Sequence, residues 1–79
     1  VFSAGNGEVE VYEITIPDQW NKIELKKLLV DEVLPVSITR AGRAILPVPE
    51  TILETSDILH VSATLEGIQS LRSQLGQGG

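Results

Sequence analysis

The residues of this chain best suited to hold a ligand are two arginines, Arg40 and Arg43. They flank a predicted turn and form the only cationic pair near the predicted central strands. Guanidinium groups donate hydrogen bonds in a planar fork that matches the oxygens of phosphates and carboxylates. The pattern leaves three interpretations open. The arginines could pair with Glu50 or Glu54 at a solvated turn, contact an anion or nucleotide, or meet another subunit.

Catalytic and metal-binding constellations are not evident in the sequence. The chain has one histidine, His60, and no cysteine, so the usual ligand clusters and nucleophile–base pairs are missing. Glu54 and Asp57 could be drawn as an acid–base pair, but both fall in a predicted turn, where solvated acids are the ordinary case. His60 is expected to be a partly exposed strand residue, with a pH sensor or ligand as the alternative. We therefore predict a chain that is not an enzyme and carries no metal or cofactor.

Length and charge narrow the class of protein further. Seventy-nine residues make one domain, and a domain this small is marginally stable unless it associates or belongs to a larger protein. The net charge of −5 argues against a nucleic-acid partner, which would require a basic stripe. No apolar run approaches the roughly 20 residues of a membrane span, so we expect no direct membrane insertion. The start at Val1 without methionine suggests a piece of a longer protein.

Alternating apolar residues predict the strands that position the arginines. Residues 34–39, 43–48 and 58–63 read as three strands, and Gly42 can take the positive φ that the first turn requires. The positions expected to face the helices are Leu34, Val36, Ile38, Leu59, Val61 and Ala63.

A further strand is predicted over residues 8–16, which are rich in β-branched side chains. Its alternation changes parity in the middle, near Val11 and Tyr12. Either a bulge there puts both apolar sets on one face, or the strand is apolar on both faces.

Two helices are predicted to cover one face of the sheet. The first spans about residues 21–29, and the second begins at Thr64 as N-cap and ends at Gly76. Trp20 is expected to seal the end of the core, with a contact surface as the alternative. The predicted fold class is α+β, a four-stranded mixed β-sheet with two helices on one face in the order β-α-β-β-β-α. The domain covers residues 8–76, between a flexible N-terminal tether (1–7) and a flexible tail (77–79).

The face of the sheet opposite the helices is predicted to carry apolar residues. A single-layer sheet with such a face exposes a patch that monomers usually avoid, so we expect a homodimer formed by this face or by a sheet edge. The residues assigned to the dimer interface are Val9, Val11, Ile45 and Ile58.

An ordered set of residues resembles a known family. The set is Ile38-x-Arg40-x-Gly42, followed by Pro47, Thr51, Leu53, Asp57, Leu59 and Val61. This spacing resembles the TrkA C-terminal domain of potassium-uptake regulators, also called the RCK C-terminal domain. The resemblance extends from about Val9 to Leu75 and departs at Ser56, where the family usually has glycine.

The resemblance implies a cytoplasmic regulatory domain, membrane-associated through a parent complex and attached to an upstream nucleotide-binding or transporter domain. Such domains pair as dimers and gate the transport of potassium or another solute. Some members resemble receptors for the cyclic dinucleotide cyclic di-AMP, bound in the dimer cleft beside the second strand. The alternative is a purely structural assembly domain with no small ligand. The residues assigned to ligand binding are Val36, Ile38, Arg40, Arg43 and Pro47.

Overall fold

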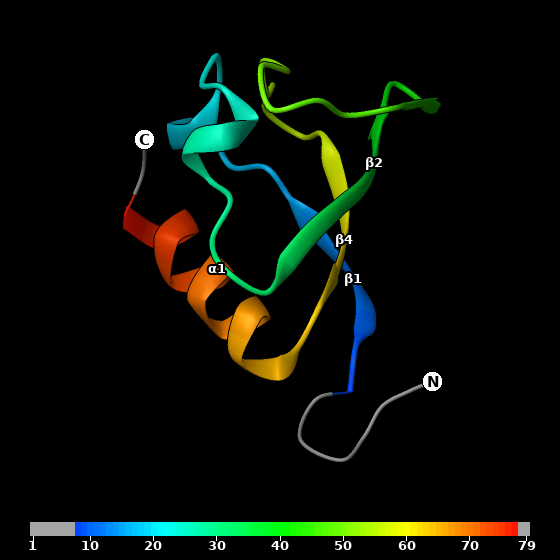
Figure 1. The fold of residues 1–79 in the computed structure, drawn as a ribbon. Coiled ribbons are helices and arrows are strands. Elements are labelled where there is room, and N and C mark those ends of the chain that lie inside the picture. The colour runs from blue at the N-terminus through cyan, green and yellow to red at the C-terminus, as the bar shows by residue number, and fades with distance from the viewer. Residues whose placement is uncertain (1–7, 78–79) are drawn as a thin grey trace.

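The chain folds into a four-stranded sheet covered on one face by a single α-helix and two short 3₁₀ turns (Figure 1). The computed structural model describes residues 8–77. The strands lie in the order β1-β4-β2-β3, and every neighbouring pair is antiparallel. The elements are β1 (Glu10–Thr15), η2 (Asp18–Trp20), η3 (Leu25–Lys27), β2 (Val33–Arg40), β3 (Arg43–Ile45), β4 (Ile58–Ala63) and α1 (Leu65–Gln77).

The α+β class is confirmed, and two details of the prediction are wrong. The sheet is antiparallel throughout instead of mixed, and one α-helix is present among the described residues instead of two. The predicted tether, residues 1–7, lies outside the described residues. Gln77, assigned to the tail, belongs to α1, which continues past the predicted stop at Gly76.

The segment predicted as the first helix takes another course because its backbone bonds to a distant loop. The N–H groups of Leu25 and Lys26 donate to the carbonyls of Thr51 and Pro49, at 2.7 and 2.9 Å. Lys22 has φ of 71°, in the left-handed region, which interrupts any helix through it. The segment therefore keeps its buried leucines but forms only 3₁₀ turns.

A β-bulge in β2 changes which side chains face the core. The register pairs Leu34 with Ser62 and Pro35 with Val61, but then Ser37 with His60, which leaves Val36 as the extra residue. One additional residue shifts the alternation, so side chains on either side of it no longer share a face. Leu34 and Val36 are 68% and 44% exposed, and the expectation that they face the helices is wrong.

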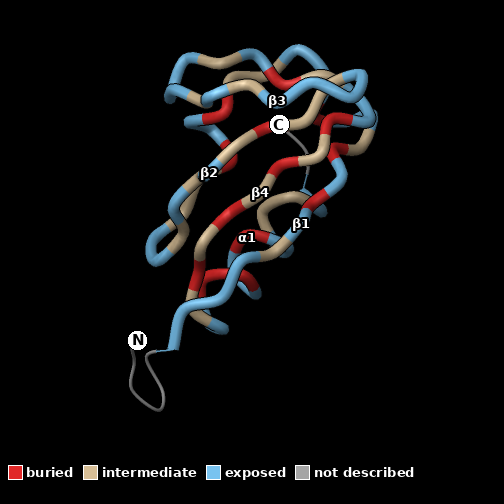
Figure 2. The backbone as a smooth tube through the Cα atoms, turned by 90° about the vertical axis from the view of Figure 1, so that its right-hand side faces the viewer, coloured by how far each residue is buried: buried red, intermediate tan, exposed pale blue. Residues whose placement is uncertain are grey.

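The other positions assigned to the core are confirmed. Ile38, Leu59, Val61 and Ala63 are buried, and Figure 2 shows buried and half-buried residues alternating along β4. The buried apolar core consists of Ile14, Ile16, Trp20, Leu25, Leu28, Ile38, Leu53, Leu59, Val61, Ala63, Ile68 and Leu71.

Strand β1 carries apolar side chains on both faces. Its pairing with β4 runs without a shift from Glu10 opposite Ala63 to Thr15 opposite Ile58, so no bulge lies in it. Tyr12 packs against the core, while Val11 on the other face is 64% exposed. The alternative that the strand is apolar on both faces is therefore confirmed, and the alternative of a bulge is wrong.

Helix α1 is fixed at both ends by side chains. At its start the N–H of Gly67 donates to the hydroxyl of Thr64 at 3.0 Å, which confirms Thr64 as the cap. At its end the indole Nε1–H of Trp20 donates to the carbonyl of Leu75 at 2.7 Å. Trp20 is also buried, so the prediction that it seals the core is confirmed. Within residues 8–77, no helix has the length and apolar character needed to cross a membrane.

Candidate functional site

The two arginines singled out by the sequence stand on either side of a tight hairpin between β2 and β3. The central residues of the turn, Ala41 and Gly42, have φ of 53° and 77°, so both are left-handed and the turn suits a two-residue hairpin. The turn borders a hollow of about 470 Å³, here called the hairpin pocket. It is lined by Arg40, Ala41, Arg43, Ala44 and Ile45.

Arg40 is committed to a structural clamp. Its Nε and Nη2 groups donate to the two carboxylate oxygens of Asp57 at 2.9 and 2.7 Å, and Nη2 also donates to the carbonyl of Ile52 at 2.9 Å. The hydrogen bond to Asp57 raises the pKa of Arg40 above its already high ordinary value, with added attraction from Glu54 at 3.5 Å. Most of the donors of Arg40 are therefore used inside the chain.

Asp57 is a buried acid, and its interpretation as a solvated turn residue is wrong. Its side chain is 2% exposed and accepts the N–H of Glu54 at 3.0 Å in addition to the fork from Arg40. The residue before it, Ser56, has φ of 75°, a conformation that favours glycine. Ser56 is also the position where the family that the sequence resembles usually has glycine. The sequence signal for this pair is an arginine at the end of one strand, Arg40, and an acid just before a later strand, Asp57 before β4.

The five residues assigned to ligand binding do not gather into one site. Arg40 and Arg43 both border the hairpin pocket, and Pro47 follows β3 in the next loop. Ile38 is fully buried in the core, and Val36 points out from the bulge. Among residues 8–77, Arg43 forms no salt bridge, so it is the cation in this pocket best placed to meet an anion.

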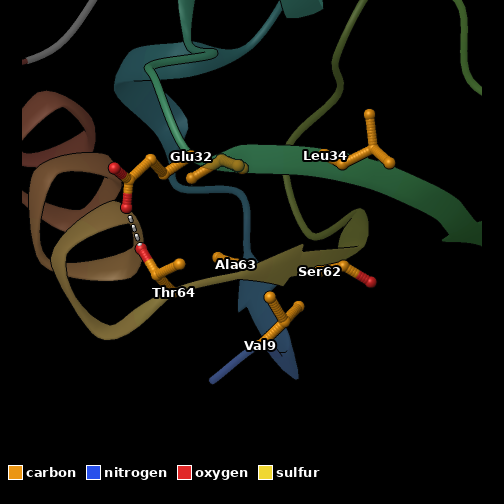
Figure 3. Close-up of a pocket in the computed structure, with 7 residues that line it drawn as sticks. Val9, Glu32, Leu34, Ser62, Ala63 and Thr64 are labelled. Atoms are coloured by element: carbon orange, nitrogen blue, oxygen red, sulfur yellow. Dashed lines mark hydrogen bonds between the residues drawn. The ribbon is translucent and has the colours of Figure 1, made fainter. Parts of the chain in front are cut away.

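Exposed apolar side chains collect on the face of the sheet turned away from α1, here called the outer face. They lie at the end where β1 begins and β2 begins, and we call this group the apolar end. A hollow of about 340 Å³ lies at this end of the sheet (Figure 3). It is lined by Val9, Glu32, Val33, Leu34, Ser62, Ala63 and Thr64. The apolar end consists of Val9, Val11, Leu34 and Val36, which are 44–68% exposed.

The residues assigned to the dimer interface fall on both sides of the sheet. Val9 and Val11 are exposed at the apolar end, and Ile58 is half-buried on the outer face between Thr15 and Thr39. Ile45 is paired with Ile38 and packs against the core instead. Leu34 and Val36, which the sequence assigned to the core, take its place among the outward apolar residues.

His60 lies on the outer face between an acid and a hydroxyl. Its Nδ1 is 3.8 Å from a carboxylate oxygen of Glu13, and its Nε2 is 3.4 Å from the hydroxyl of Thr39. The side chain is 23% exposed, which confirms a partly exposed strand histidine. Glu13, Thr39 and His60 lie on three adjacent strands, β1, β2 and β4.

Comparisons with known proteins point to one family. The TrkA-C domain matches residues 21–76, a range that contains β2, β3, β4 and most of α1. Among solved structures, one described as an RCK domain with cda is 27% identical, with a TM-score of 0.71. The match covers 82% of this chain and 96% of that chain. The comparison with curated proteins gives no match.

Proposed function

The chain belongs to the TrkA-C domain family, and on that premise we propose that it is a ligand-sensing, dimerising module of a potassium or other ion-transport system. Domains of this family regulate ion transport and are generally not catalytic. The observation that carries the proposal is the family match over residues 21–76, which includes both arginines and Asp57. The module would act in the cytoplasm, attached to an upstream nucleotide-binding or transporter domain.

Sensing in such a module requires two arrangements of the pair of domains with different affinities for the ligand. A ligand that prefers one arrangement shifts the population toward it and biases the attached domains. The solved relative is described with cda, which supports a small ligand for this chain as well. We assign the anionic part of that ligand to the hairpin pocket, where Arg43 is the available guanidinium.

A thermal-shift experiment tests the sensing function. Cyclic di-AMP, mononucleotides and divalent cations would each be titrated against the chain. A ligand at a hundred times its dissociation constant adds about 2.7 kcal/mol of stability, which for a domain of this size raises Tm by roughly 10 °C or more.

Two variants locate the site. Arg43→Ala should abolish the rise in Tm, because it removes the cation of the hairpin pocket that forms no salt bridge. Lys22→Ala removes an exposed cation between η2 and η3, outside the pocket, and should leave the rise in Tm intact. A flat response of the unaltered chain to the whole panel would favour the alternative, a purely structural assembly domain.

A further inference from the structure

We propose that Glu54 is a built-in competitor for the anion of the hairpin pocket. Its carboxylate occupies the Nη1 group of Arg40, and a phosphate group displaces it and binds Arg40 and Arg43 together. The inference rests on the proposed sensing function, because it takes the hairpin pocket as the anion site. It adds a second arginine to that site and a residue that sets the affinity.

The register of the hairpin brings the two guanidinium groups to one face of the sheet. Arg40 is paired directly with Arg43 across β2 and β3, and both line the hairpin pocket. Directly paired residues project on the same face with Cβ atoms about 5 Å apart, and like charges in such a pair are destabilising. A phosphate bound between the two arginines would remove this repulsion, and its oxygens suit guanidinium donors.

Arg40 has one nitrogen left for a ligand. Its Nε and Nη2 groups donate hydrogen bonds to Asp57 and to the carbonyl of Ile52, and within residues 8–77 its Nη1 group donates none. The Nη1 atom lies 3.5 Å from a carboxylate oxygen of Glu54, whose side chain is 46% exposed. An exposed ion pair of this kind is weak. A ligand can therefore replace Glu54 without breaking the clamp between Arg40 and Asp57.

The backbone of Glu54 is held in place, so only its side chain has to move. Its N–H donates to the carboxylate of Asp57 at 3.0 Å, and its carbonyl accepts the N–H of Asp57 at 3.0 Å. With the glutamate side chain on Arg40, the two arginines and the two acids carry no net charge. Once that side chain leaves, two arginines and one acid remain, which gives the site one net positive charge.

A titration of the full chain tests the competition. Inorganic phosphate and cyclic di-AMP are the two probes, added at constant ionic strength, and NMR chemical shifts give the dissociation constant. A site that is open in only a fraction of the molecules binds more weakly by that fraction. Because exposed ion pairs are weak, Glu54→Gln should lower the dissociation constant by about two- to fivefold.

Glu50→Gln is the matched control for the loss of charge. Glu50 is exposed in the same loop and forms no salt bridge within residues 8–77, so its replacement should leave the dissociation constant unchanged. Neither glutamate is buried, so both variants should keep the thermal midpoint of the parent chain in circular dichroism.

The arginine signals supply a second measurement, made on the wild-type chain. Either probe should shift the Nη1 signals of Arg40 and the guanidinium signals of Arg43. The Nε signal of Arg40 should move little, because that group stays bonded to Asp57. Arg43→Ala should abolish binding.

The outcomes separate this inference from the function on which it rests. If neither probe bound the wild-type chain or the Glu54→Gln variant, both the competitor and the proposed anion site would be overturned. Binding that depends on Arg43 but changes equally, or not at all, in the two glutamate variants would overturn the competitor alone. If only one probe binds, the variants are compared with that probe, which identifies the source as free phosphate or a nucleotide phosphodiester.

Discussion

At the scale of single residues, Asp57 holds the long loop between β3 and β4 to the sheet. Its carboxylate receives two hydrogen bonds from Arg40 and one from the backbone of Glu54, and its own carbonyl accepts the N–H of Ile16 at 2.9 Å. One buried acid thus joins the hairpin, the loop and the end of β1. Removing one partner of a buried pair leaves the other charge without compensation, which is why such sites are sensitive to substitution.

Replacing Asp57 should destabilise the fold far more than replacing its neighbour. Asp57→Asn keeps the shape but removes the charge, and we expect a loss of about 2–4 kcal/mol in the free energy of unfolding measured in urea. The carboxylate of Glu54 lies 3.5 Å from the guanidinium of Arg40, and the Glu54 side chain is 46% exposed. Glu54→Gln should therefore lower the free energy of unfolding by less than about 1 kcal/mol. Equal losses for the two variants would contradict the clamp.

The contribution of Arg40 to stability should not vary with pH near neutrality. The pKa of Arg40 is raised in the folded chain by its bond to Asp57. A group with a raised folded pKa contributes its full stability below its unfolded pKa and loses it as the pH rises through the folded value. For an arginine this loss falls only at strongly alkaline pH.

Ser56 should be a site where glycine stabilises the chain. Its φ of 75° places a side chain in the left-handed region, which costs about 1–2 kcal/mol and costs glycine almost nothing. Glycine also loses more conformational entropy on folding, which offsets part of this gain. We therefore expect Ser56→Gly to raise the free energy of unfolding, measured in urea, by roughly 0.5–1 kcal/mol. Ser70→Gly, on the exposed side of α1, should instead lose a similar amount. A loss at Ser56 would show that its side chain supplies a contact worth more than the strain.

At the scale of elements, sequence patterns predict the strands and helices that depend on local interactions. Strand β4 follows strict alternation and α1 has a capping threonine, and both were predicted with nearly correct limits. The segment before β2 was predicted as a helix because its leucines have helical spacing. Its backbone partners lie some 25 residues away in Pro49 and Thr51, and no local pattern records them.

The bulge in β2 explains the largest error in the predicted core. One extra residue moves Leu34 to the other face without altering the alternation that the sequence displays. A signal was available in Pro35, because proline in a central strand is tolerated chiefly at bulges. For the site, the hairpin and its arginines could be predicted from Gly42 and the flanking strands. The engagement of Arg40 by Asp57 could not, since it depends on how the loop folds back.

The docking of α1 depends on a glycine that allows close contact. A Cβ atom built on Gly67 would lie 2.3 Å from the carbonyl oxygen of Glu32, far inside normal contact. Gly67→Ala should therefore cost roughly 1–3 kcal/mol, because the helix or the turn at Glu32 has to move. Gly76→Ala is the matched control in the same helix, with open space around its Cβ, and should gain up to about 1 kcal/mol.

Chemical denaturation followed by circular dichroism would measure both glycine variants. If Gly67→Ala stabilised the chain as Gly76→Ala should, the close approach of α1 to Glu32 would be contradicted.

At the scale of the whole molecule, the sheet has one face covered by α1 and the 3₁₀ turns and one face without cover in the described chain (Figure 2). A domain of this length buries only about 60% of the surface of its unfolded chain, so covering a further apolar area adds a large share of its stability. A regulatory module also needs a partner against which its arrangement can change. We therefore expect a partner to cover the outer face with its apolar end.

The mass of the unaltered chain in solution tests this account most directly. Sedimentation equilibrium at micromolar concentration should give a particle of twice 8.6 kDa. A single species of 8.6 kDa that persists to the highest attainable concentration would contradict it.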